Sequence, residues 1–77
     1  MSRVFTDPNL MTWEAYSTGG AYGLPENPAI VFNCLSDPES RARFTIVNGT
    51  EATAQEAVHA MSDDQLRNML AGSSPLD

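Results

Sequence analysis

Apolar residues gather in three segments of the N-terminal half, and each segment has the composition of a β-strand. Met11 to Thr18 contains Trp13, Tyr16 and two threonines, which favour extended backbone. Ala29 to Leu35 is almost continuously apolar, and Arg43 to Val47 alternates in polarity. We therefore predict a three-stranded antiparallel β-meander over residues 11–47.

Proline and glycine separate these segments, and all five prolines fall outside them. Gly19 to Pro28 is predicted as a long loop, and Ser36 to Ser40 as a tight polar turn. Residues 1–10 are predicted as an N-terminal arm. Within it, Arg3 to Phe5 is either short extended chain or a brief edge strand.

After Gly49 the apolar spacing changes to a helical period. Thr53 to Glu56 and Ser62 to Gln65 both fit the capping box, which marks a helix N-terminus. Two caps in succession predict two short helices within residues 53–71, and Gly72 stands where a helix commonly ends. The expected fold is α+β, a single small domain over residues 1–77 with a frayed tail at 72–77.

The central strand is apolar on both of its faces, because side chains alternate between the two sides of a sheet. We expect the helices to cover one face and to bury Trp13, Ile30, Phe32, Phe44 and Ile46. The other face then needs a second cover over Tyr16, Val31, Leu35 and Val47. Either the arm (Val4, Phe5) and the loop (Ala21, Tyr22, Leu24) fold back over it, or a protein partner or a second copy does so.

Charge and length exclude several classes of function. The 77 residues carry a net charge of −6, with ten carboxylates, four arginines and no lysine, which opposes direct binding to nucleic acid. No apolar run approaches the roughly 20 residues that span a bilayer. Residues 1–10 lack the apolar run of a signal peptide. With a single cysteine, these features predict a cytoplasmic protein.

Four features resemble reactive or ligand-binding sites, and each has a simpler explanation. His59 follows Glu56 on a helix, but no nucleophile stands in a defined relation to it. Cys34 lies within a strand, away from any cation that would activate it. Thr18 to Gly23 resembles a phosphate loop without the helix that such a loop needs, and Asp63-Asp64 suits a helix N-terminus. We therefore predict no catalytic residue, no metal site and no bound cofactor.

Aromatic residues and arginine are enriched at protein interfaces, and this guides the choice of partner-binding residues. Arg41 and Arg43 lie near the predicted hairpin, where Arg43 would contact Trp13 if the two were cross-strand neighbours. The predicted partner contacts are Trp13, Tyr16, Val31, Leu35, Arg41 and Arg43.

The order of these segments resembles a loose class of short bacterial α+β domains. The shared features are Phe5-x-Asp7, the Trp13 to Tyr16 strand, Ile30-Val31-Phe32, Arg41-x-Arg43, and a closing helix over Ser62 to Leu70. The resemblance implies the fold; its members have no assigned activity, and it transfers no functional residue.

These observations favour a non-catalytic accessory subunit that docks on a larger protein assembly. The cytoplasmic face of a membrane complex is one candidate host. A first alternative is an acidic regulatory module that masks a basic site on a partner. A second alternative is binding of a small ligand at the Gly19 to Pro28 loop.

Overall fold

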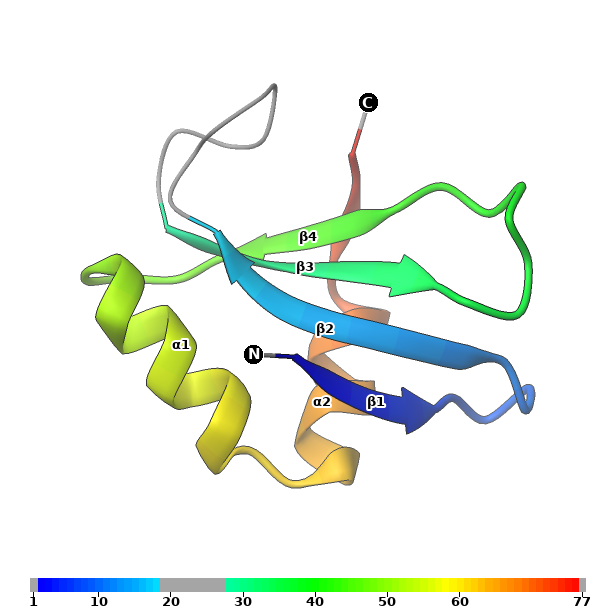
Figure 1. Cartoon of the computed structure of the whole chain (residues 1–77), viewed down its shortest axis with the longest axis horizontal. Helices are drawn as coiled ribbons and strands as arrows, with labels where there is room; N and C mark the ends of the chain where they lie inside the picture. Colours follow the sequence, from blue (N-terminus) through cyan, green and yellow to red (C-terminus); the bar gives the residue numbers. More distant parts are fainter. Residues whose placement is uncertain (1, 19–27, 77) are drawn as a thin grey trace.

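A computed structural model describes residues 2–18 and 28–76, which form one antiparallel sheet with two helices on one side (Figure 1). The sheet has five strands in the order β1-β2-β3-β4-β5. Their bounds are β1 Arg3–Thr6, β2 Thr12–Thr18, β3 Ala29–Cys34, β4 Arg43–Ile46 and β5 Ser74–Pro75, with helices α1 Glu51–Ala60 and α2 Asp63–Ala71. The predicted α+β class is confirmed.

The predicted number of three strands was wrong, because both ends of the chain add a strand to the meander. The N-terminal arm pairs with β2, which places Phe5 opposite Trp13. The tail expected to be frayed returns to β4, where Pro75 pairs with Arg43 and Ser74 with Phe44. Two residues of tail cannot signal a strand by their pattern, since the pairing depends on where α2 ends.

The turn between β1 and β2 is organised by the side chain of Asp7. Its Oδ1 accepts hydrogen bonds from the backbone amides of Asn9 and Met11, at 2.8 and 2.9 Å. The turn ends at Leu10, whose backbone is in the left-handed region with φ 65°. The side chain of Leu10 is 82% exposed.

The two helices begin at different kinds of cap. Ser62 and Gln65 form the predicted capping box at the start of α2. At α1 the prediction was wrong by one turn, since Thr50 is the N-cap and its hydroxyl accepts a bond from the amide of Thr53. Thr53 is therefore already inside the helix.

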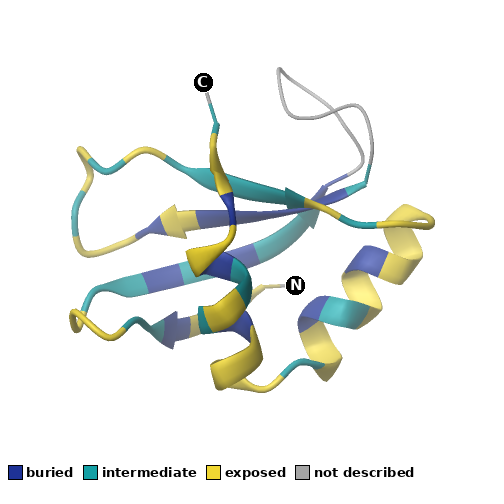
Figure 2. Ribbon diagram, turned by 180° about the vertical axis from the view of Figure 1, so that it is seen from behind, coloured by how far each residue is buried: buried dark blue, intermediate teal, exposed yellow. Residues whose placement is uncertain are grey.

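The hydrophobic core lies between the helices and one face of the sheet, and buried residues of both helices face the strands (Figure 2). Phe32 at its centre is fully buried and meets the edge of the Phe5 ring at a centroid distance of 6.1 Å. The arm thus adds Phe5 to this face, so Phe5 does not cover the opposite one, which was the first of the two alternatives drawn from the sequence. The predicted core positions Trp13, Ile30 and Phe32 are confirmed; Val58, Leu66 and Leu70 supply the helical side.

Phe44 and Ile46 do not join this core, which corrects the expected orientation of β4. Arg43 pairs with Phe32 and Thr45 with Ile30, so these polar residues share the helix-covered face. A register shift of one residue exchanges the two faces of a strand, and the alternation along β4 alone did not select one of them. This register has a cost, since the buried hydroxyl of Thr45 finds no partner among the described residues.

Arg3 connects the first strand to both helices. Its Nη1 donates to the carbonyl oxygens of Val58, His59 and Met61, at 3.1, 3.3 and 2.8 Å. Its Nη2 reaches Asp63 in the first turn of α2, at 2.8 Å. One guanidinium therefore satisfies the C-terminal carbonyls of α1 and fixes the corner between the two helices.

Candidate functional site

The six predicted partner contacts separate into two groups on opposite sides of the sheet, with two further residues in the connection after β3. Tyr16 and Val31 lie on the side that the helices leave open, where they are register partners. Trp13 and Arg43 lie on the helix-covered side. Leu35 and Arg41 belong to the connection between β3 and β4, and both are exposed. No single surface therefore holds the whole predicted set.

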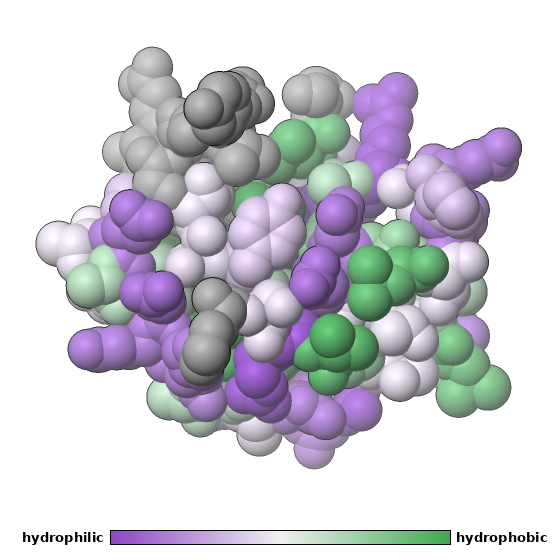
Figure 3. Space-filling view, viewed as in Figure 1, coloured by the Kyte–Doolittle hydropathy of each residue, from purple (hydrophilic) through white to green (hydrophobic). Residues whose placement is uncertain are grey.

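The open face of the sheet carries a row of apolar side chains with graded exposure, next to the polar pair of Glu14 and Asn33. Tyr16, Val31 and Phe44 follow one another across β2, β3 and β4, and Ile46 pairs with Ala29 one step along. Val31 is only 1% exposed, whereas Ile46 is 44% exposed. Hydrophobic and hydrophilic side chains are intermixed on this side of the molecule (Figure 3). The accessible apolar positions are thus on the outer strands.

The helix-covered side contains a cleft of about 360 Å³ between the β1–β2 turn and α2. It lies beside the core, at the edge where the sheet and the second half of α2 meet. The turn contributes Asp7 and Pro8, the sheet Trp13 and Arg43, and α2 contributes Arg67, Asn68, Leu70 and Ala71.

Two arginines of this cleft are held in place by backbone oxygens. Arg43 donates from Nε to the Ser73 hydroxyl at 2.8 Å and from Nη2 to the Ser73 carbonyl. Arg67 donates from Nε to the carbonyl of Thr6 at 2.5 Å and from Nη1 to Asp64 at 2.7 Å. Both guanidiniums are thereby oriented before any ligand arrives, which lowers the entropic cost of binding.

Asp7 and Trp13 also line the cleft. The indole Nε1 donates to Asp7 Oδ2 at 2.8 Å, while the turn amides of Met11 and Asn9 donate to Oδ1. The hydrogen bond from the Trp13 indole, together with those from the two amides, holds the pKa of Asp7 below its ordinary value of 3.8. Desolvation of the carboxylate acts in the opposite direction and raises this pKa. The sequence offered a signal for the turn in Asp7-Pro8-Asn9, but none for the contact with Trp13.

Lowering the pH is expected to weaken the contact between Asp7 and Trp13. Because the folded pKa of Asp7 is depressed, its contribution to stability is present above pH 3.8 and is lost as the pH falls below that value. We expect the Trp13 Nε1 proton in NMR spectra to report a midpoint below 3.8. Asp7→Asn, which cannot ionise, should remove that transition, and a midpoint at or above 3.8 would contradict the assignment.

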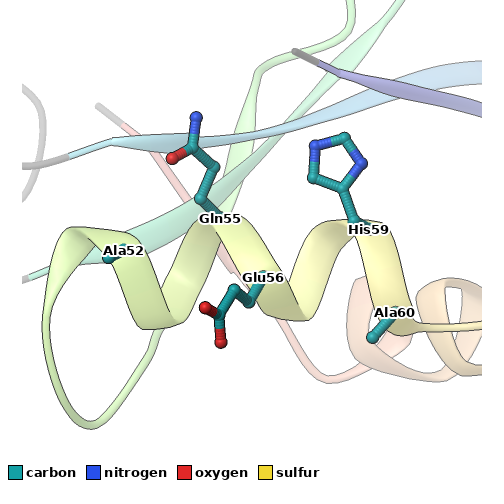
Figure 4. Close-up of a pocket in the computed structure, with 5 residues that line it drawn as sticks. All are labelled: Ala52, Gln55, Glu56, His59 and Ala60. Carbon is teal, nitrogen blue, oxygen red and sulfur yellow. The ribbon is translucent and has the colours of Figure 1, made fainter.

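A second hollow, of about 490 Å³, lies on the outer side of α1. Its described lining comes from this one helix and includes Gln55, Glu56 and His59 (Figure 4). Gln55 and His59 project to one side, whereas the Glu56 carboxylate points away from the imidazole. The Glu56–His59 pair considered from the sequence therefore does not form an acid–base pair in this arrangement.

The other residues considered for catalysis or metal binding take part in the packing and ion pairs of the fold. Cys34 is a buried thiol in the core, opposite Trp13 in the register. Asp63 and Asp64 pair with Arg3 and Arg67. Over residues 2–18 and 28–76, no three histidine, cysteine or acidic side chains come together in a way that could hold a metal ion. Residues 19–27, which carry most of the predicted glycine-rich loop, lie outside the described residues.

Sequence reasoning did not identify the roles of Asp7, Arg67, Phe44 and Ile46. A partial signal for Arg67 exists, because it follows Asp64 by three residues on a helix. In the part of the chain that the structure describes, the helices are too short or too polar to cross a membrane. Comparison with family models, curated proteins and solved structures finds no match to this chain.

Proposed function

We propose that this protein is a non-catalytic accessory subunit that docks on a partner protein through the open face of its sheet. The observation that carries this proposal is the orientation of β4, whose Phe44 and Ile46 turn away from the helices. Apolar side chains that remain accessible on a sheet face are typical of contact surfaces. Val4 on β1, 56% exposed, extends the same face to the opposite edge.

The arginine side chains hold parts of the fold together, and this supports a binding role over a catalytic one. Arg3, Arg43 and Arg67 all donate to backbone oxygens: Arg3 to the end of α1, Arg43 to the segment after α2, and Arg67 to β1. Of the six sequence-predicted contacts, Tyr16 belongs to the docking face, and Leu35 extends beyond the end of β3. Val31 lies on that face but is only 1% exposed, so it offers almost no surface to a partner.

Ile46→Glu is expected to abolish partner binding with little loss of stability, because Ile46 is already 44% exposed. A buried carboxylate at the interface would be unpaired and costly. Leu10→Glu is the matched control, since Leu10 is exposed but lies in the β1–β2 turn. Affinity purification of the tagged full chain from its source, followed by mass spectrometry, should recover one stoichiometric partner with the wild type and Leu10→Glu.

Two results would overturn the docking proposal. One is equal recovery of the partner by Ile46→Glu and the wild type. The other is a wild-type chain that light scattering shows to be monomeric and that captures no stoichiometric protein.

The acidic surface of the helices favours a second candidate, a regulatory module that masks a basic site. Glu51 and Glu56 on α1 are exposed, and the chain carries a net charge of −6. Masking depends on charge, so it predicts that affinity falls steeply as salt rises from about 50 to about 500 mM. Docking through the open sheet face predicts only a modest change over the same range.

A further inference from the structure

The cleft between the β1–β2 turn and α2 concentrates positive charge in an acidic protein. The chain has four arginines and no lysine, and two of the four, Arg43 and Arg67, line this one cleft. Arg67 is paired with Asp64, a carboxylate that is 87% exposed and therefore strongly screened. Arg43 has no carboxylate partner among the described residues, because it bonds only to the neutral groups of Ser73. Among the described residues of the lining the one carboxylate is that of Asp7, and it already accepts hydrogen bonds from Trp13 Nε1 and from the amides of Asn9 and Met11, so Arg43 has no ion-pair partner in the cleft.

Both guanidiniums also retain N–H donors that the bonds described above do not use. A guanidinium carries five N–H groups, and the bonds described above use Nε and Nη2 of Arg43, and Nε and Nη1 of Arg67. Within the described part of the chain, Arg43 Nη1 and Arg67 Nη2 have no hydrogen-bond partner. The exposed amide of Asn68 also lines the cleft and can donate.

Apart from Asp7, the rest of the lining is apolar and limits the size of what can bind. Pro8, Trp13, Leu70 and Ala71 surround the polar groups. A volume of about 360 Å³ is at the lower end of the range for small-molecule sites, roughly 300 to 1,000 Å³. Arginine forks bind carboxylates with two parallel hydrogen bonds, and the indole edge favours an apolar group beside that carboxylate.

We propose that this cleft binds a carboxylate that carries a small apolar group, such as the C-terminal residue of a peptide or a short free carboxylic acid. Arg43 and Arg67 donate to the carboxylate, and Trp13, Pro8 and Leu70 contact the apolar group. The site is separate from the open sheet face, and its test does not depend on the docking partner.

Trp13 is the only tryptophan of the chain, so its fluorescence reports directly on the cleft. The probe is acetyl-Ala-Leu with a free carboxylate, titrated into the full chain, with the corresponding amide as its control. We expect a saturable change with a Kd of about 0.1 to 1 mM for the acid, and at least about tenfold weaker binding for the amide. An unchanged emission, or equal binding of acid and amide, would overturn the proposal.

Variants separate binding from folding. Arg43→Gln should weaken binding of the acid roughly tenfold, as expected for loss of one charge-assisted hydrogen bond. Because Arg43 also supports the chain after α2, Asn68→Asp provides a second variant at an exposed position, where the added carboxylate repels the ligand to a similar extent. Arg41→Gln makes the same charge change outside the cleft and should leave the Kd unaltered. Full affinity in Asn68→Asp, in a chain with unchanged circular dichroism, would disprove the site.

Hexanoate, titrated in parallel, distinguishes the two sources of the carboxylate. Tighter binding of acetyl-Ala-Leu than of hexanoate identifies a peptide C-terminus as the ligand, because the additional amides then contribute. Tighter binding of hexanoate identifies a free carboxylic acid. Both results support the carboxylate site, whereas binding of neither acid overturns it.

Discussion

Phe32→Ala is expected to lower the free energy of unfolding by about 3 to 5 kcal/mol, because the side chain is completely buried and its removal leaves a cavity. A chain of 77 residues has a total stability of roughly 4 to 12 kcal/mol, so the loss is a large share of the total and leaves a chain at the lower end of this range close to unfolded. Urea denaturation followed by circular dichroism measures the change.

Phe44→Ala is the matched control, since it removes the same ring from the open face. Phe44 is only partly buried, and we expect a loss of about 1 to 2 kcal/mol. The comparison also tests the register of β4. If the two alanine variants were equally destabilised, Phe44 would belong to the helix-covered core, and the docking face would lose its central aromatic residue.

Arg3→Met is expected to have the second largest effect, about 2 to 3 kcal/mol of lost stability. The substitution leaves three carbonyl oxygens at the end of α1 without their donor, and bonds to a charged group contribute more than neutral ones. The Arg3 side chain is 27% exposed, so water can replace these bonds only in part. Thermal and urea denaturation should both detect the loss.

Two related variants identify which contacts of Arg3 carry this effect. Arg3→Lys keeps the charge but lacks the planar fork, so we expect an intermediate loss of about 1 kcal/mol. Asp63→Asn breaks only the ion pair with a carboxylate that is 52% exposed, and it should cost about 0.5 kcal/mol or less. A larger loss in Asp63→Asn than in Arg3→Lys would show that the ion pair, and not the carbonyl contacts, holds the corner between the helices.

The placement of the strands explains why the candidate cleft could not be found from the sequence. Trp13 and Arg43 were predicted as partner contacts because aromatic residues and arginine are enriched at interfaces, and a contact between the two was expected only if they were cross-strand neighbours. They are not cross-strand neighbours, because Trp13 pairs with Cys34 and Arg43 with Phe32. They meet only as two walls of the same cleft, completed by Arg67 of α2. A contact that involves a turn, a sheet and a helix leaves no local pattern.

Local patterns did determine the central strands, both helices and the cap at Ser62. Strand composition, helical periodicity and turn residues act over a few neighbouring positions, so their physical effects can be recognised along the chain. The apolar character of both faces of β3 was also visible in the sequence. It indicated that the open side of the sheet needs a cover.

Tertiary structure alone decided the face of β4, the two added strands and the positions of the arginines. Phe44 and Thr45 exchange sides with a register shift of one residue, and the register depends on pairing with β3. Arg3 and Arg67 each bond to an element some 60 residues away along the chain. Such contacts exist only after the chain has folded, because they depend on where helix ends and strand edges come to lie.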